Sequence, residues 1–267
     1  MTPVRLTLMR DGACRQLERV ALRTGRWRMI EFEATFALIE HPTAGGVLFD
    51  TGYTRRFFEE TRRFPNRLYR MITPVRLHSA PAVEQVKMPM RHVIVSHFHA
   101  DHIGGLRDFP EANLHCSRRA WEAVKNLRGL SALRRGFLPG LVPVDFASRA
   151  QFSEDCAVCA LPPECAPFTE GFDLLGDGSL LAVELPGHAE GQLGVFLREE
   201  SGTLTLLLAD GAWSRRAIRG NTPPARCVGL LGDWRQLTAT LAMLHELHRR
   251  NPRTRLIPSH CPEIWRD

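Results

Sequence analysis

The stretch SHFHADHIGG, residues 96–105, limits what this chain can fold into more than any other feature. It places His97, His99, Asp101 and His102 within six positions, directly after the apolar run HVIVS. At the end of an extended strand, residues two apart point to the same side, so His97 and His99 can bind one ion. The chain then turns, and Asp101 and His102 leave at an angle that suits a second ion. We therefore expect a metal centre at the end of a buried strand.

Three further polar residues stand in the same context, each at the carboxyl end of an apolar strand. They are His188 in LLAVELPGHAEGQ, Asp210 in TLTLLLADG and His260 in RLIPSH. Together they would complete a shell around two ions. Imidazole nitrogen and carboxylate oxygen favour Zn(II), with Fe or Mn as alternatives.

This combination of motifs resembles the metallo-β-lactamase superfamily of metallohydrolases. The family pattern is H-x-H-x-D-H, then P-G-H, an apolar strand ending in Asp, and a terminal strand ending in S-H. VLFDTG, residues 47–52, is similar to the family's early strand with its D-T-G turn. The resemblance covers nearly the whole chain. It implies an α/β fold of the αββα sandwich type, with two mixed β-sheets packed face to face and helices on the outer faces.

The resemblance also implies which residues bind which ion. The ligands of the first ion would be His97, His99 and His188, and those of the second Asp101, His102 and His260. Asp210 matches the carboxylate that bridges both ions, and Asp50 is expected to orient a ligand histidine. The β-lactamases themselves lack the second residue of the D-H pair and carry Cys where Asp210 stands, so we do not expect antibiotic hydrolysis.

The distribution of strand and helix patterns agrees with a single domain over residues 1–267. Strands fall into two groups, each followed by helices, which predicts two sheets. Helical segments are expected at 54–72, broken by Pro65, and at 233–250, where the apolar periodicity is strong. Residues 128–171 show weak periodicity and many Pro, Gly, Phe and Cys residues. We interpret them as a lid-like excursion or pocket wall.

The chemistry expected of such a site is hydrolysis. Hydroxide held by two divalent ions would attack an ester or lactone carbonyl, because metal binding lowers the pKa of water towards ~7. Asp101 would carry the proton to the leaving group, and Asp210 would hold the ions together. A thioesterase of the glyoxalase II kind is the main alternative, and a phosphodiesterase is a weaker one. A mono-iron dioxygenase holds one metal ion and would not need the complete second set of ligands. A metal-free binding protein would need neither set of ligands.

The substrate is expected to be a small ester, lactone or thioester, since size and compactness look most like the N-acyl-homoserine-lactone lactonases. The apolar segment from Phe57 to Ile72 could form an acyl pocket, with Phe57, Tyr69 and Trp213 in contact with substrate. Those lactonases carry a Tyr three residues after the bridging Asp that helps to hold the substrate carbonyl. Trp213 stands there in this chain, and its indole N–H can donate one hydrogen bond but cannot accept one. Tyr53 and Tyr69 are the only two phenols.

Composition and charge limit the partners and the cellular compartment that we expect for this chain. The formal net charge is +6, but the basic pairs are dispersed and interleaved with Glu, and no nucleic-acid motif accompanies them. No apolar run is long enough for a membrane helix and the start lacks a secretory pattern, so we expect a cytoplasmic chain. Seven cysteines, among them Cys156, Cys159 and Cys165, are then expected to be reduced. Nothing in the sequence indicates the oligomeric state.

Overall fold

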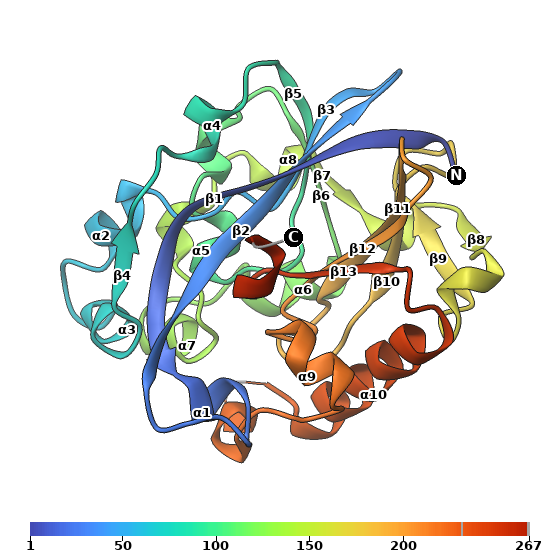
Figure 1. The fold of residues 1–267 in the computed structure, drawn as a ribbon. Coiled ribbons are helices and arrows are strands. Elements are labelled where there is room, and N and C mark those ends of the chain that lie inside the picture. Colours follow the sequence, from blue (N-terminus) through green and yellow to red (C-terminus); the bar gives the residue numbers. More distant parts are fainter. Residues whose placement is uncertain (231, 266–267) are drawn as a thin grey trace.

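The computed structural model describes residues 1–230 and 232–265, and within these ranges the strands join into one mixed sheet of thirteen (Figure 1). The first half of the sheet contains β1 (Pro3–Leu17), β2 (Met29–His41), β3 (Gly45–Phe49), β4 (Val75–Leu77), β5 (Met90–Ile94), β6 (Asn113–Cys116) and β7 (Ala150–Phe152). The second half contains β8 (Val158–Ala160), β9 (Glu170–Asp173), β10 (Leu181–Glu184), β11 (Leu193–Glu199), β12 (Leu204–Ala209) and β13 (Arg255–Pro258). The strand order is β7-β6-β5-β3-β2-β1-β11-β10-β9-β8, with β12 and β13 continuing from β11 and β4 pairing with β1.

The expectation of two separate sheets was wrong, because β1 belongs to both halves. β1 runs for 15 residues through an irregularity between Arg10 and Ala13. Its first residues pair in parallel with β11, with Val4 opposite Glu199. Backbone hydrogen bonds therefore connect the two groups of strands. The α/β class and the mixed pairing agree with the prediction.

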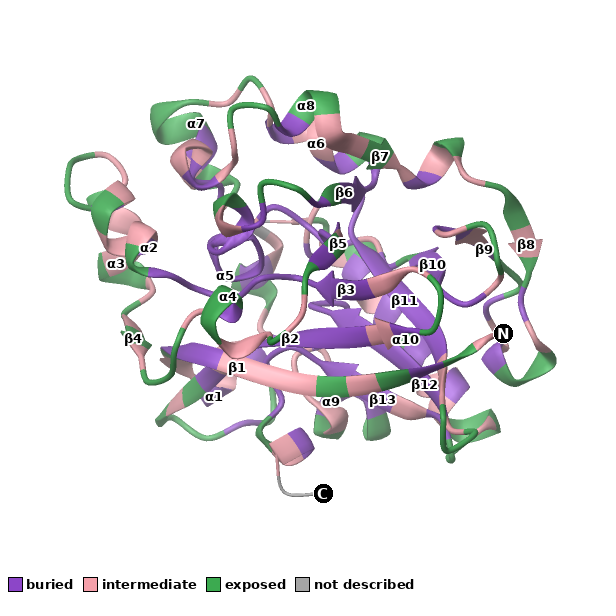
Figure 2. Cartoon of the chain, turned by 90° about the horizontal axis from the view of Figure 1, so that it is seen from above, coloured by how far each residue is buried: buried purple, intermediate pink, exposed green. Residues whose placement is uncertain are grey.

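The two halves of the sheet nevertheless share an apolar core. One buried cluster contains Val47 and Ile94 from the first half together with Val195 and Leu207 from the second. Figure 2 shows these central strands buried and the outer surfaces of the surrounding helices exposed. The helices are α1 (Glu18–Ala21), α2 (Arg55–Glu60), α3 (Arg67–Ile72), α4 (Ala82–Gln85), α5 (Ala100–Ile103), α6 (Arg118–Val124), α7 (Gly129–Arg134), α8 (Phe146–Arg149), α9 (Arg215–Arg219) and α10 (Trp234–Arg250).

The longest helix, α10, follows the amphipathic pattern that predicted it. Asp233 caps its start, since the Asp233 carboxylate accepts hydrogen bonds from the backbone N–H groups of Arg235 and Gln236. Its buried face includes Leu241 and Leu244, which pack with strands of the second half of the sheet. The expected break at Pro65 is also present, because α2 ends before it and α3 begins after it.

Residues 128–171 hold more regular structure than their composition suggested. The segment contains α7, α8 and the short strands β7 and β8, which pair with β6 and β9. Phe137, Leu141 and Phe146 are fully buried in the core on that side. Most of the segment therefore packs as part of the fold, and only the end of α7 reaches the pocket described below.

Two absences hold within the described ranges. No helix there is long and apolar enough to cross a membrane. The seven cysteines, which all lie within these ranges, are free.

Candidate metal centre

Parallel strand pairing brings polar residues together at one edge of the sheet. The end of β3 lies beside the end of β5, with Phe49 opposite Ile94, so Asp50 and Ser96 become neighbours. The end of β12 lies beside the end of β13 in the same way, and Asp210 and His260 follow these strands. Asp50 adopts a φ of 60°, a left-handed conformation that costs of order 1–3 kcal/mol where no glycine is present.

The first ligand motif bends around the start of α5. His99 occupies the position before the helix, and Asp101 and His102 lie in its single turn, where the His102 N–H bonds to the His99 carbonyl at 3.1 Å. The helix then packs against the D-T-G turn. A β-carbon on Gly104 would lie 2.4 Å from the carbonyl oxygen of Gly52, so only glycine permits this approach.

All seven candidate ligands meet at this edge. Their side chains form three overlapping groups in which one ligand atom of each residue lies within 4.8 Å of the others. The groups are His97–His99–His188, His97–His102–Asp210 and Asp101–His102–His260. Cys156, Cys159 and Cys165 belong to no such group among residues 1–230 and 232–265. The first and third groups have the members that the resemblance implied for the two ions, and the second joins His97, His102 and Asp210.

Individual distances place Asp210 at the centre of the cluster. Its Oδ2 lies 3.1 Å from His188 Nε2, and its Oδ1 lies 3.2 Å from His260 Nε2 and 3.6 Å from His102 Nε2. Asp101 Oδ2 lies 3.3 Å from His260 Nε2. On the other side, His99 Nδ1 and His188 Nε2 are 2.9 Å apart. Asp210 thus contacts ligands of both sets.

Two observations indicate that these residues are suited to bind metal ions. First, three buried polar atoms here have no hydrogen-bond partner among the described residues: His97 Nε2, His102 Nε2 and Asp210 Oδ1. Native proteins rarely leave such atoms unpaired. Second, burial lowers the pKa of His97 well below its usual range, that of His99 to about 3 and that of His188 to about 4. These imidazoles are therefore neutral at pH 7, the form that binds a metal.

Asp50 anchors His102 from behind. Its Oδ2 lies 2.7 Å from His102 Nδ1 and accepts the Ser96 hydroxyl at 2.8 Å, while Oδ1 accepts the Ser96 N–H. Burial lowers the pKa of His102, but the carboxylates of Asp101 and Asp50 outweigh it and raise this pKa to about 10. Asp50 therefore fixes which nitrogen of His102 faces the ligand cluster.

Replacing Asp50 with asparagine should weaken the centre without unfolding the chain. Loss of such a partner costs roughly 10- to 100-fold in metal affinity or activity. Elemental analysis and turnover would measure the effect. Asp177→Asn is a matched control, because Asp177 Oδ2 pairs with His41 Nε2 at 3.0 Å in another part of the fold. Equal metal affinity and turnover in the two variants would contradict this role for Asp50.

Two partners of the ligands carried no clear signal in the sequence. His260 Nδ1 lies 2.6 Å from the backbone carbonyl of Glu33, an atom that every residue type offers. The Ser96 hydroxyl, which bonds Asp50, also lies 3.0 Å from His97 Nδ1. Ser96 could have been found, since it stands directly before the motif on a buried strand.

A mostly apolar cavity of about 450 Å³ opens onto the ligands. His99, Asp101, His188, Asp210 and His260 form part of its lining. Its apolar walls come from several parts of the chain, namely Cys14, Val20, Ala21, Phe32, Ile72, Leu133 and Val228. The candidate centre is thus exposed to a space that suits a small molecule with an apolar group.

Of the residues expected to contact substrate, two line the cavity and one does not. Tyr69 and Trp213 line the cavity, as does Tyr53. Burial raises the pKa of both phenols well above the ordinary range, so they stay protonated. Phe57 is fully buried in the core and is not among the lining residues; its ring packs 5.2 Å from that of Tyr53 and 5.7 Å from that of Tyr69. Phe57 therefore supports the two phenols from behind.

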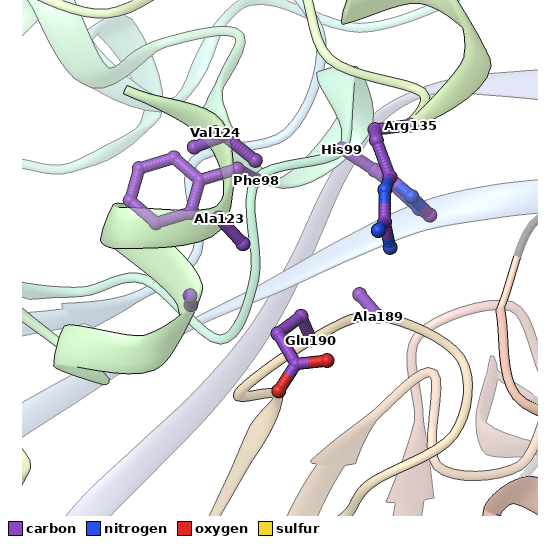
Figure 3. Close-up of a pocket in the computed structure, with 8 residues that line it drawn as sticks. Phe98, His99, Ala123, Val124, Arg135, Ala189 and Glu190 are labelled. Atoms are coloured by element: carbon purple, nitrogen blue, oxygen red, sulfur yellow. The ribbon is translucent and has the colours of Figure 1, made fainter. Parts of the chain in front are cut away.

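A second, small pocket lies on the other side of His99 (Figure 3). Phe98 and His99 point in opposite directions in this view, with Phe98 towards Val124 and His99 towards Arg135. At the end of α7, Gly136 has a φ of +63°, and a β-carbon there would lie 2.7 Å from His99 Cδ2. The end of α7 therefore packs directly on a candidate ligand.

The sequence of this chain matches the model of the Metallo-beta-lactamase superfamily over residues 32–207. The chain belongs to this superfamily. The matched segment includes the H-x-H-x-D-H motif, His188 and the first part of the strand before Asp210, while Asp210 and His260 follow it. The family predicted from the motifs is confirmed.

Relatives within the superfamily include lactonases. N-acyl homoserine lactonase AttM of Azorhizobium caulinodans is 25% identical over 281 residues, which cover 99% of this chain and 96% of that protein. An N-acyl homoserine lactone hydrolase, solved with N-hexanoyl-L-homoserine at its catalytic metal centre, has a TM-score of 0.72 at 17% identity, over 100% of this chain and 96% of that one. AidC, described as a dizinc quorum-quenching lactonase, has a TM-score of 0.61 at 16% identity, over 96% and 87%. This chain is thus a metallo-hydrolase related to N-acyl homoserine lactonases.

Proposed function

We propose that this chain is a dinuclear metal-dependent hydrolase that opens lactones or related esters with an apolar acyl group. The observation that carries the proposal is the position of the ligand cluster in the lining of the apolar cavity. A substrate whose acyl group fills the cavity would present its carbonyl to the ligands. The similarity to lactonases over nearly the full length supports the same substrate class.

Seven residues would hold the ions: His97, His99 and His188 on one side, Asp101, His102 and His260 on the other, and Asp210 between them. When bound, two divalent ions, Zn(II) by the donor set, supply Lewis acidity for the carbonyl and lower the pKa of water. Asp101 lines the cavity, and its carboxylate would take up the proton that the nucleophile releases and pass it to the leaving oxygen.

The cavity walls would bind and orient the rest of the substrate. Phe32, Ile72 and Val228 provide apolar surface, and the phenols of Tyr53 and Tyr69 remain donors because they do not ionise near pH 7. The apolar wall would also displace water from the reacting carbonyl, which strengthens polar interactions there.

A thioesterase is the second candidate, and Arg134 favours it. Arg134 lines the cavity at the end of α7 and is exposed, so its guanidinium can meet an anionic thiol carrier. An N-acyl lactone has no such charge. The two candidates therefore differ in what Arg134 contributes.

A substrate panel tests the proposal. The metal-loaded protein should hydrolyse N-acyl lactones and apolar esters with higher kcat/KM than anionic acyl thioesters, and phosphodiesters should not react. Arg134→Ala should leave the lactone rate unchanged and lower only the thioester rate. Thioester turnover that exceeds lactone turnover and depends on Arg134 would favour the second candidate. Turnover of phosphodiesters alone would overturn both.

A further inference from the structure

The indole of Trp213 is bonded to the central carboxylate of the cluster. Trp213 Nε1 donates a hydrogen bond to Asp210 Oδ2 at 2.9 Å. An indole N–H is a donor with a single proton, and it does not ionise. The N–H that would otherwise face the cavity already has a carboxylate partner.

The Trp213 ring is itself held by other aromatic rings of the site. It meets the His188 ring edge to face, with centroids 5.6 Å apart and an interplanar angle of 82°. Phe32 packs on the indole at 6.2 Å and on the His260 ring at 5.6 Å, again nearly perpendicular. Perpendicular aromatic contacts of this kind are favourable. Trp213 and Phe32 therefore connect Asp210, His188 and His260 from the cavity side.

The bond restricts rotation of the Asp210 carboxylate. Oδ2 is also close to His188 Nε2, at 3.1 Å, whereas Oδ1 has no hydrogen-bond partner among the described residues. A carboxylate oxygen has two acceptor positions, so the indole N–H leaves Oδ2 a second one, which faces His188 Nε2 at 3.1 Å and His260 Nε2 at 3.2 Å. With Oδ2 held in this way, both oxygens keep lone pairs directed at the cluster.

We infer that Trp213 is a positioning residue for Asp210, and that it acts on metal binding through this carboxylate instead of holding the substrate carbonyl. The inference rests on the proposed metal centre. If Trp213 acts in this way, other residues that line the cavity must donate hydrogen bonds to the substrate carbonyl. Tyr53 and Tyr69 line the cavity and carry hydroxyl groups. It differs from a role as passive wall, in which Trp213 would change only substrate preference.

The test compares Trp213→Phe with Trp121→Phe, which makes the same change of ring in a different environment. Trp121 lies on α6 and packs on Phe98 and Phe146. Each variant and the original chain would be loaded with Co(II), whose visible absorption reports ligand geometry, and the bound metal would be titrated with a chelator. Values of kcat and KM would be measured for short-chain and long-chain lactones.

Trp213→Phe should change the Co(II) spectrum, lower the affinity for at least one ion and lower kcat, by the roughly 10- to 100-fold typical of such partners. KM should stay similar for both chain lengths, and Trp121→Phe should behave like the original chain in all three measurements. An unchanged spectrum and metal affinity in Trp213→Phe, with KM altered according to chain length, would overturn the inference and leave the proposed function intact. Failure of the original chain to bind Co(II) would instead overturn the proposed function.

Discussion

Replacing Asp210 with alanine should remove most bound metal and most activity, more than any other single change in the ligand cluster. Asp210 contacts ligands of both sets through both of its oxygens, so its loss affects both ions. The loss should exceed the roughly 10- to 100-fold that removal of an outer partner of a ligand costs. His260→Ala removes a ligand of one set only, and it should retain more metal and more turnover than Asp210→Ala.

Elemental analysis and kcat/KM on a lactone would measure both quantities. Asp210→Asn is a second variant that separates loss of the ligand from misfolding. It keeps the size of the side chain and one oxygen while it removes the charge. Asp173→Ala is a control for loss of a buried aspartate, since Asp173 accepts the backbone N–H groups of Gly176 and Gly178 away from the cluster. If Asp210→Asn kept both ions and full turnover, Asp210 would not be the shared ligand.

The ligand cluster could be predicted because its chemistry lies in side chains at strand ends. His97, His99 and His188 are rare polar residues after apolar runs, and parallel pairing puts such ends at one edge of a sheet. Spacing and residue type were enough to group them. The partners that are backbone atoms, such as the Glu33 carbonyl beside His260, have no such signature.

The sheet and the pocket were predicted less well, for physical reasons that differ. The single sheet was not predicted because it depends on the length of β1, whose second part, DGACRQL, follows a bulge and does not alternate regularly. Phe57 was expected to face the substrate because it is apolar and near the site in sequence. Whether such a ring lines a cavity or supports its wall depends on the packing of Tyr53 and Tyr69 in front of it.

The hydrogen bond between Trp213 and Asp210 could be predicted from the sequence only in part. The position of Trp213, three residues after Asp210, predicted that the ring would lie over the cluster, and it does line the cavity. The direction of its N–H is set by packing against the rings of Phe32, on β2, and His188, in the segment that follows β10. Packing between residues far apart in the sequence therefore decides the role of Trp213, and this packing cannot be read from a single sequence.

Removal of the metal ions should lower the stability of the whole chain. Six of the seven ligand residues are buried, and without ions the negative charges of Asp101 and Asp210 are offset by neighbouring imidazoles and, for Asp210, by the Trp213 N–H. A ligand that binds only the folded state at 1,000 times its Kd adds about 4 kcal/mol of stability. For a chain of this size 1 kcal/mol moves Tm by roughly 2–4 °C, so metal removal should lower Tm by on the order of 10 °C.

Thermal unfolding of chelator-treated and Zn(II)-reloaded protein would measure the shift, and elemental analysis of the reloaded sample should find about two ions per chain, as the seven ligands require. Asp177→Asn, which breaks a carboxylate–histidine pair outside the cluster, should show the same metal-dependent shift as the original chain. Asp210→Ala should show little, because it has lost the shared ligand. A Tm that does not respond to metal in the original chain would mean that the buried imidazoles and carboxylates are satisfied by one another, and a single ion after full reloading would contradict the dinuclear arrangement.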